Sequence, residues 1–159
     1  MAQVLPDWSD RRDIEFQSFG EALAEVDRLL NGRYERRGNW DLAQACDHLA
    51  YSFEGSVRGF DFGAPRIVQA LVGQYALRYV LKNRRAPFRP RVPKRLEPPS
   101  GKDPVASADR LKESIREFES AAEVARHPFF GKISHDQWRQ VHLFHCAHHL
   151  AFLHPVPAA

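Results

Sequence analysis

The 159-residue sequence predicts an all-α protein, and three observations support that prediction. Apolar residues recur at intervals of three and four along several segments, which is the period of a helix with one buried face. Most of these segments open on a capping pattern, in which Ser or Asp precedes Glu or Gln by three residues. No run of alternating β-branched and polar residues indicates a strand. We therefore expect a bundle of four or five helices.

Two capped segments near the N-terminus are the first two expected helices. The first opens at Ser18, has Glu21 at the capping-box position and ends at Gly32. Its apolar stripe is Leu23, Val26, Leu29 and Leu30. The second opens at Asp41, has Gln44 at the capping-box position and leads into a glycine-rich stretch. Its apolar face is Leu42, Ala45, Cys46, Leu49 and Phe53.

The middle of the chain joins an apolar segment to a proline-rich one. We expect a third helix from about Pro65, a favourable first-turn residue, to Asn83. Because this segment is apolar on nearly every side, it is expected to be mostly buried. Six of the eleven prolines then exclude a helix or a central strand: Pro87, Pro90, Pro93, Pro98, Pro99 and Pro104. The result is a long loop at about 84–106, between the third and fourth helices, of a length typical of functional or disordered segments.

Two further helices are expected in the last third of the chain. The fourth covers about 107–125, with an apolar stripe of Leu111, Ile115, Phe118 and Ala122. The last opens at Ser134, with Gln137 at the capping-box position, and continues to about Leu153. Three histidines lie near helix ends, where capping or turn roles are expected for His127 and His135, and an exposed position for His154.

The composition favours one ordinary globular domain and excludes several classes of protein. Hydrophobic residues make up 43% of the chain and charged residues 27%. Only two cysteines are present, Cys46 and Cys146, so a disulfide scaffold is excluded. We see no secretory signal, and the most apolar stretch, 67–81, is too short to span a bilayer. We expect a cytoplasmic protein without a membrane partner, with one domain over 1–159 and a core at about 16–153.

Basic charge is concentrated in one segment. The chain has a net charge of +3, but residues 82–102 contain eight Lys and Arg residues and one acidic residue, Glu97. That segment has a net charge of +7, which leaves −4 for the rest of the chain. It suits an anionic substrate or cofactor if it folds over a site, while a solvated loop is the simpler interpretation. Nucleic-acid binding ranks last, because Phe88 is the one aromatic residue there for base stacking.

The last expected helix contains a cluster of histidines. Four of the eight histidines lie between residues 142 and 149. At about 100° per residue, His145 and His149 lie one turn apart near the middle of the apolar face, and His148 lies at its flank. Buried imidazole is costly unless its nitrogens are satisfied. Two histidines at i and i+4 can also give two nitrogens to one metal ion.

Two interpretations of this cluster stay open at this point. The imidazoles hydrogen-bond to buried carbonyls or line a solvent-filled cleft, or they bind a metal ion. A third ligand must come from another helix, and His48 is the only histidine of the second helix. His48 lies beside the centre of the apolar stripe. The sequence is therefore equally consistent with a histidine at the surface or edge of the helix that binds no metal. Asp47 points to a different side, and Cys146 is better explained as a half-buried thiol than as a ligand.

Three motifs in the chain resemble the DinB/YfiT-like superfamily, and within it a branch known only as a domain of unknown function. The motifs are NWDLAQACDHLAYSFEGSVRGF (39–60), HPFFGKISHDQW (127–138) and HLFHCAHHLAFL (142–153). Together the resemblance covers the chain from about Phe16 to Leu153. It implies a four-helix bundle, here with the long proline-rich basic loop between the third and fourth helices.

The resemblance also implies a metal site. In the superfamily three histidines hold a divalent ion, one from the second helix and two, at i and i+4, from the last. On this chain those positions are His48, His145 and His149. His142 and His148 are additional histidines that can orient the ligands, relay protons or simply pack. Zn²⁺ is the expected ion, and Ni²⁺ is also compatible with imidazole ligands.

Characterised superfamily members include thiol S-transferases that use low-molecular-weight bacterial thiols. The resemblance therefore implies a metal-dependent transferase or hydrolase acting on a small molecule, with such a thiol as a candidate co-substrate. Many members follow the last ligand with Arg-Gly-Gln, where this chain has Leu150, Ala151 and Phe152. That departure keeps open a non-enzymatic protein that binds a metal or a small molecule. Helix faces of such bundles also pair, which makes a homodimer an additional expectation.

Overall fold

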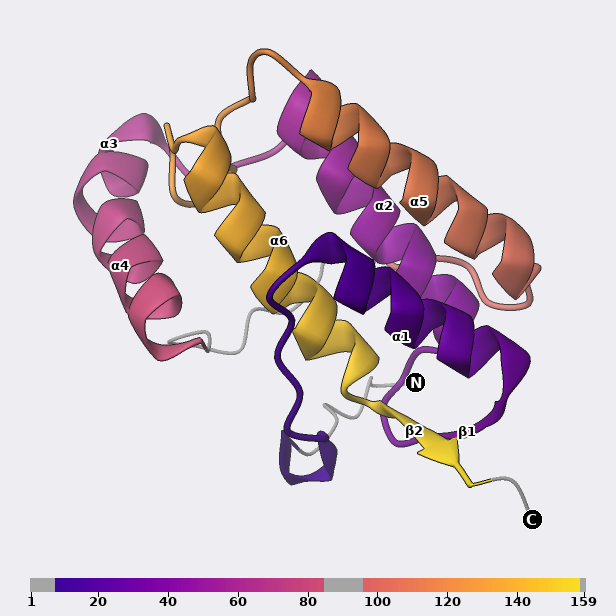
Figure 1. Cartoon of the computed structure of the whole chain (residues 1–159). Coiled ribbons are helices and arrows are strands. Elements are labelled where there is room, and N and C mark those ends of the chain that lie inside the picture. Colours follow the sequence, from indigo (N-terminus) through magenta and orange to yellow (C-terminus); the bar gives the residue numbers. More distant parts are fainter. Residues whose placement is uncertain (1–7, 85–95, 158–159) are drawn as a thin grey trace.

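The computed structural model describes residues 8–84 and 96–157, and helices dominate it (Figure 1). Four long helices contribute to one core: α1 (Phe19–Asn31), α2 (Leu42–Arg58), α5 (Pro104–Ser120) and α6 (His135–Leu150). Beside α6 lies a further helical segment made of α3 (Arg66–Val68), a π-helical turn (Gln69–Gly73) and α4 (Gln74–Asn83). A 3-10 turn, Trp8–Asp10, precedes α1. The prediction of a mostly helical protein is confirmed. Across residues 8–84 and 96–157, no helix combines the length and the apolar character needed to cross a bilayer.

The first turns of the helices follow the capping residues in the sequence. The Ser18 side chain accepts a hydrogen bond from the Glu21 N–H at the start of α1. Reciprocal capping boxes open α2, through Asp41 and Gln44, and α6, through Ser134 and Gln137. Each box satisfies backbone N–H groups that the first turn of a helix leaves without partners. The two helices that carry the predicted ligands therefore begin where the sequence predicts.

The start of α5 differs from its prediction. This helix begins at Pro104 instead of Ser107, because Asp103 accepts a hydrogen bond from the Val105 N–H and acts as its N-cap. Proline suits the first position of a helix, where its missing N–H is not needed. Pro104 therefore opens a helix rather than excluding one, and the loop predicted at 84–106 ends at Asp103. Residues 85–95 of that loop lie outside the described residues.

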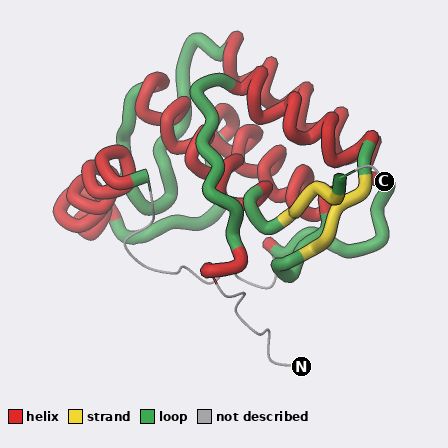
Figure 2. The backbone as a smooth tube through the Cα atoms, turned by 60° about the horizontal axis from the view of Figure 1, so that its bottom comes forward, coloured by secondary structure: helices red, strands yellow, loops and turns green. Residues whose placement is uncertain are grey.

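A small sheet corrects the all-α prediction. β1 (Arg33–Arg36) and β2 (Leu153–Val156) pair antiparallel, with Arg33 opposite Val156 and Arg36 opposite Leu153 (Figure 2). α6 accordingly ends at Leu150 rather than at Leu153, just as α5 ends at Ser120 rather than Ala125. Strands of four residues carry too little periodicity to be recognised in a sequence. Their pairing also joins segments that lie far apart along the chain.

The expectation that the third helix is mostly buried is wrong. Several large apolar side chains of the α3–α4 segment are exposed, with exposed fractions of 39–72%: Ile67, Val68, Leu71, Val72 and Tyr75. Its buried side consists of Gln69, Gly73, Ala76, Leu77 and Val80. A segment that is apolar all round does not indicate which of its sides other elements cover. Here α6 lies along one side of the segment (Figure 1).

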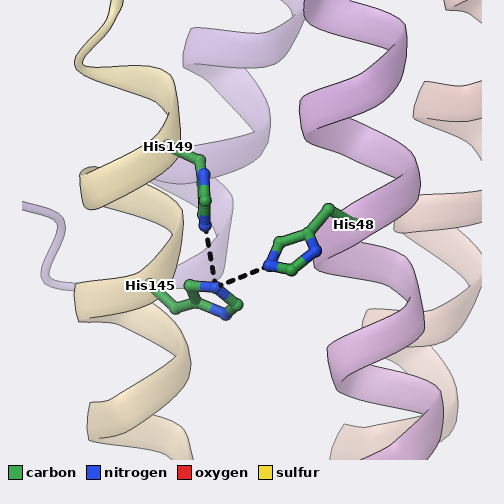
Figure 3. A group of neighbouring side chains, drawn as sticks. All are labelled: His48, His145 and His149. Carbon is green, nitrogen blue, oxygen red and sulfur yellow. Dashed lines mark hydrogen bonds between the residues drawn. The ribbon is translucent and has the colours of Figure 1, made fainter. Parts of the chain in front are cut away.

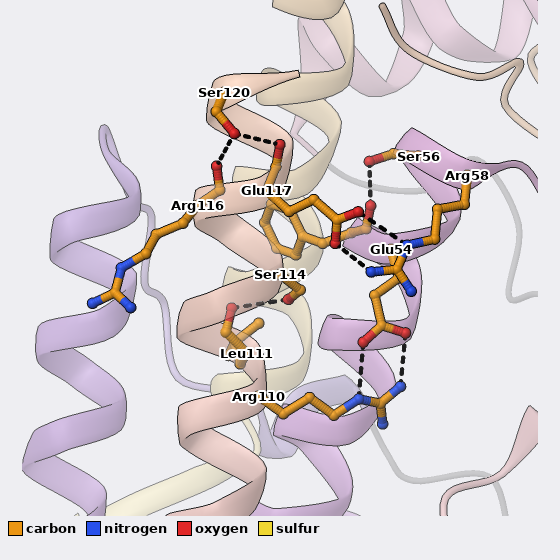
Figure 4. A network of polar contacts seen from close by, with 10 residues as sticks. Glu54, Ser56, Arg58, Arg110, Leu111, Ser114, Arg116, Glu117 and Ser120 are labelled. Carbon is orange, nitrogen blue, oxygen red and sulfur yellow. Dashed lines mark hydrogen bonds and ion pairs between the residues drawn. The ribbon is translucent and has the colours of Figure 1, made fainter.

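Ion pairs join α2 to α5 along the outside of the core (Figure 4). Arg110 donates to both carboxylate oxygens of Glu54 at 2.9 Å. Arg58 binds Glu117 in the same two-fold manner, at 2.9 and 2.7 Å. Ion pairs at an exposed surface contribute only about 0–1 kcal/mol each. Their structural effect is to fix the position of α2, the helix that carries His48, against its neighbour.

Core and exposed leucines are expected to differ sharply in their effect on stability. Leu49 is fully buried on α2, while Leu71 is 72% exposed. Leu49→Ala should lower the free energy of unfolding by about 2–5 kcal/mol, because it leaves a cavity. Leu71→Ala should change it by less than about 0.5 kcal/mol. Urea denaturation of both variants measures the difference, and equal losses would contradict the exposed position of the α3–α4 segment.

Candidate metal centre

Three half-buried imidazoles from α2 and α6 meet at one point between these helices (Figure 3). His48 Nε2 lies 3.2 Å from His145 Nε2, and His149 Nε2 lies 2.9 Å from the same atom. One ligand nitrogen from each residue lies within 4.8 Å of the other two. His145 and His149 are one turn apart on α6 and both project toward α2, as the helical period predicts. The structure thus brings together the three histidines to which the resemblance pointed, and we call them the histidine cluster.

Linear hydrogen bonds cannot satisfy all three nitrogen atoms. In the ring plane an imidazole nitrogen has either one hydrogen or one lone pair, so it makes one linear hydrogen bond, and a second partner can share it only in a bent, three-centre contact. His145 Nε2 faces both His48 Nε2 and His149 Nε2, and it can pair linearly with only one of them. Leaving a buried polar atom unpaired costs about 1–3 kcal/mol. A cation at the common point would accept lone pairs from all three rings at once.

The separations also fit the coordination shell of a small metal ion. Zn–N bonds of about 2.0–2.1 Å in a tetrahedral site place the nitrogen atoms about 3.3 Å apart. The two shortest separations in the histidine cluster, 2.9 and 3.2 Å, are close to that value. Binding of an ion would bring the third separation, which lies within 4.8 Å, toward the same value. The three residues therefore fit a divalent metal that favours imidazole nitrogen.

All three rings of the histidine cluster are in the protonation state that binds metals. Burial lowers the pKa of His145 to about 4. Burial, reinforced by the neighbouring histidines, lowers the pKa of His48 and His149 well below the ordinary 6.5. The imidazoles are consequently neutral at pH 7, and neutral imidazole is the metal-binding form.

Trp40 forms one wall of the histidine cluster, a role that the sequence prediction did not assign. Its ring stacks on His149, with centroids 5.0 Å apart and planes at 17°. It also contacts His48 at 4.7 Å and a steeper angle. Trp40 directly precedes Asp41, the N-cap of α2, so the indole projects from backbone that the capping box holds in place. An aromatic residue just before the capping box of a helix that carries a candidate ligand is the signal that could have identified it.

The two additional histidines of α6 lie in different surroundings. His148 packs edge-on against His149, with ring centroids 4.9 Å apart. His142 is fully buried and stacks on Phe53. Its Nε2 lies 3.0 Å from Ser56 Oγ, and that hydroxyl already donates to the Phe53 carbonyl. The His142 Nε2–H therefore donates to Ser56, which links α6 to α2 across the core.

The histidines predicted at helix ends make local contacts. His127 Nδ1 accepts hydrogen bonds from the N–H groups of Phe129 and Phe130, at 3.1 and 3.0 Å. His135 Nε2 lies 3.0 Å from the Phe118 carbonyl oxygen. These contacts agree with the expected turn and capping roles. His154, which was expected to be exposed, is partly buried in β2.

A cavity of about 140 Å³ opens beside His48. It is lined by Asp47, His48, Tyr51, Leu96, Glu97, Pro98, Pro99, Lys102 and Arg110. Asp47 pairs with Lys102 at 2.8 Å and with Arg110 at 3.2 Å, so the two cations are already engaged by a carboxylate. Lys102 and Glu97 belong to the basic segment predicted at 82–102, whose central residues, 85–95, are not described. The described end of that segment therefore lies next to the histidine cluster.

One family model matches the chain over residues 8–156, and its description is "Protein of unknown function (DUF1569)". No curated protein and no solved structure matches the chain. The match confirms the coarser part of the prediction, a domain family of unknown function. The wider DinB/YfiT-like assignment stays a prediction, and the match contributes no activity or ligand.

The stability of the chain should depend on pH through His127. Burial, with a smaller effect of His145, lowers the His127 pKa from 6.5 to about 3. Below pH 6.5 the unfolded chain therefore binds a proton that the folded chain does not, and stability falls as pH falls. This group alone contributes up to about 1.4 kcal/mol per pH unit. In His127→Asn, the side-chain oxygen can still accept hydrogen bonds from the backbone, but the side chain does not titrate. Urea denaturation at pH 6.5 and pH 4 should show a smaller loss in this variant, and equal losses would contradict the prediction.

Proposed function

We propose that this chain, which belongs to the family described as "Protein of unknown function (DUF1569)", binds a divalent metal ion through His48, His145 and His149. The observation that carries the proposal is the convergence of three Nε2 atoms that linear hydrogen bonds cannot all satisfy. The neutral state of the rings supports it further. The proposal includes a metal-binding four-helix bundle of the DinB/YfiT-like type, for which the packing of α1, α2, α5 and α6 around one core is the supporting feature.

Zn²⁺ is the proposed ion, with Ni²⁺ as the second candidate, because both accept imidazole nitrogen. Three protein ligands are typical of catalytic metal sites, whereas structural zinc sites are closed by four. When bound, the ion supplies Lewis-acid chemistry, which makes a water or a thiol easier to deprotonate.

The residues around the histidine cluster would contribute orientation and substrate access. Stacking of Trp40 on His149 restricts rotation of that imidazole and shields one of its faces from water. The cavity beside His48 is large enough for part of a small molecule. Lys102 and Arg110 at its edge can interact with an anionic group, in competition with Asp47. These features support a metal-dependent transferase or hydrolase for a small molecule, with a low-molecular-weight thiol as candidate co-substrate.

A non-enzymatic role is the second candidate, and one observation favours it. The positions that carry Arg-Gly-Gln in many superfamily members hold Leu150, Ala151 and Phe152, whose exposed fractions are 0%, 0% and 7%. These side chains belong to the apolar interior and offer no polar group to a substrate. On this alternative the chain binds a metal or a small molecule without turning it over.

Metal binding should depend on the histidine cluster and not on histidine content. The purified wild-type chain should bind about one Zn²⁺ in a chelator competition. Single replacement of His48, His145 or His149 by Ala should weaken binding by more than about 100-fold, the upper end of the loss for residues that only support a ligand. Zinc at 100 times the wild-type Kd should stabilise the wild-type chain by about 2.7 kcal/mol and the variants by less than about 0.4 kcal/mol.

The matched control is His154→Ala, because His154 lies in β2 and its Nε2 contacts the Asp10 carbonyl oxygen. This variant should bind zinc like the wild-type chain. Equal metal content in the wild-type chain and in a His145→Ala/His149→Ala variant would refute the proposed site.

Enzymatic and non-enzymatic roles are separated by an assay for thiol transfer. The zinc-loaded and nickel-loaded chains would be incubated with low-molecular-weight thiols and model electrophiles, and the loss of free thiol followed. Turnover that disappears in His145→Ala supports the transferase. A copurifying small molecule together with no turnover of thiols or esters favours the binding protein.

A further inference from the structure

Apart from Asp47 Oδ2, which is ion-paired with Lys102, two buried polar atoms that belong to the lining of the cavity beside His48 have no hydrogen-bond partner among the described residues. One is His48 Nδ1, on the ring edge opposite the nitrogen that faces His145. The other is Glu97 Oε1. Both residues line the same cavity of about 140 Å³. One atom can donate a hydrogen bond and the other can accept one, so they are complementary.

The need for an acceptor at His48 follows from the proposed metal site. If His48 Nε2 gives its lone pair to an ion, the proton of the neutral ring must be on Nδ1. Metal-bound histidines almost always donate that second N–H to a carboxylate, a carbonyl or a water, which fixes the ring orientation. His48 Nδ1 is buried and reaches no acceptor directly within the part of the chain that the structure describes. Among the three rings of the cluster, this requirement is therefore most acute for His48.

Glu97 is the carboxylate best placed to meet this requirement. The other acidic residue that lines the cavity, Asp47, is paired with Lys102 at 2.8 Å and with Arg110 at 3.2 Å. It also lies on α2 directly before His48, on a different side of that helix. Glu97 directly precedes Pro98, whose carbonyl contacts α2 through Gln44, and its Oε1 has no hydrogen-bond donor among residues 8–84 and 96–157.

The residues that follow Glu97 are attached to α2 at two points. Gln44, one turn before His48, donates through Nε2 to the Pro98 carbonyl at 2.9 Å. Lys102 reaches Asp47 four residues further on. Gln44 also completes the capping box of α2, so the same side chain contributes to the start of the helix and to the position of Pro98. Glu97 therefore directly precedes a stretch that is held against the part of α2 that contains His48.

We infer that Glu97 is a positioning residue for the metal site: as the ring of His48 turns to give Nε2 to the ion, Glu97 accepts the Nδ1–H directly or through a water of the cavity. In the conformation shown both atoms are shielded from water, so this contact forms only with that movement. The inference rests on the proposed function, because the proton is fixed on Nδ1 only when Nε2 binds an ion. The cavity is far larger than the roughly 15 Å³ that one water requires. A bridging water is also nearly as good enthalpically as a direct hydrogen bond. The effect on the metal is indirect: the carboxylate orients the ring and makes it a more basic ligand.

Zinc affinity of the full-length chain, measured by chelator competition, tests the role of Glu97. Glu97→Ala removes the acceptor and should weaken zinc binding by about 10–100-fold. Glu97→Gln keeps an acceptor oxygen without the charge and should bind with intermediate affinity. Glu123→Ala, at an exposed glutamate after α5, is the matched control and should bind as the wild-type chain does. Thermal unfolding without added metal shows whether each variant folds.

A spectroscopic readout separates hydrogen bonding from a general effect of charge or packing. In the zinc-loaded wild-type chain, the His48 Nδ1 proton should give a protected downfield NMR signal, assigned by its loss in His48→Gln. The signal should be lost to solvent exchange in Glu97→Ala and retained in Glu97→Gln.

Each contrary result has a distinct meaning. Wild-type zinc affinity and a retained signal in Glu97→Ala would overturn the role of Glu97 and leave the proposed metal site intact. If zinc binding weakens equally in Glu97→Ala and Glu97→Gln and the signal is unchanged in both, Glu97 acts only through its charge, and the inference is overturned. No zinc binding by the wild-type chain would overturn the proposed function and this inference together.

Discussion

The contact of His48 Nε2 with His145 Nε2 at 3.2 Å requires α2 and α6 to face each other across the core in one register. A shift of one residue along either helix would turn its imidazole by about 100° and move it away from the common point. Apolar packing alone tolerates such changes more easily than a polar cluster that must be satisfied. The remainder of the structure can be understood as the set of contacts that keeps this register.

Several elements contribute to that register from different directions. The capping boxes at Asp41 and Ser134 fix the first turns of α2 and α6. The bidentate pairs of Arg58 and Arg110 attach α2 to α5, and the pairing of β1 with β2 anchors the chain directly after α6. The His142–Ser56 contact adds a polar link inside the core. The candidate ligands therefore lie on helices held at their ends and along their sides, which suits a preorganised metal site.

Much of the site was predictable because its determinants are local. The i, i+4 spacing of His145 and His149 on an apolar face follows from the helical period, and His48 was the only histidine on another long capped helix. Trp40 and Glu97 escaped prediction because their roles depend on which segments meet in space. The same reason explains the missed sheet and the exposed α3–α4 segment: a four-residue strand has little periodicity, and an apolar helix does not reveal which side its neighbours cover. The error at Pro104 is of a different kind. Proline breaks a helix in its interior, so the sequence prediction excluded a helix there, but in the structure Pro104 is the first residue of α5.

The central claim is that three imidazole nitrogens bind one metal ion, and X-ray absorption spectroscopy of the zinc-loaded chain tests it most directly. The account predicts a first shell of nitrogen and oxygen atoms at about 2.0–2.1 Å, with outer-shell scattering that corresponds to three histidine rings. That scattering should fall to two rings in His48→Ala loaded at high zinc. A sulfur neighbour at about 2.3 Å, or a wild-type shell of light atoms without imidazole scattering, would contradict it.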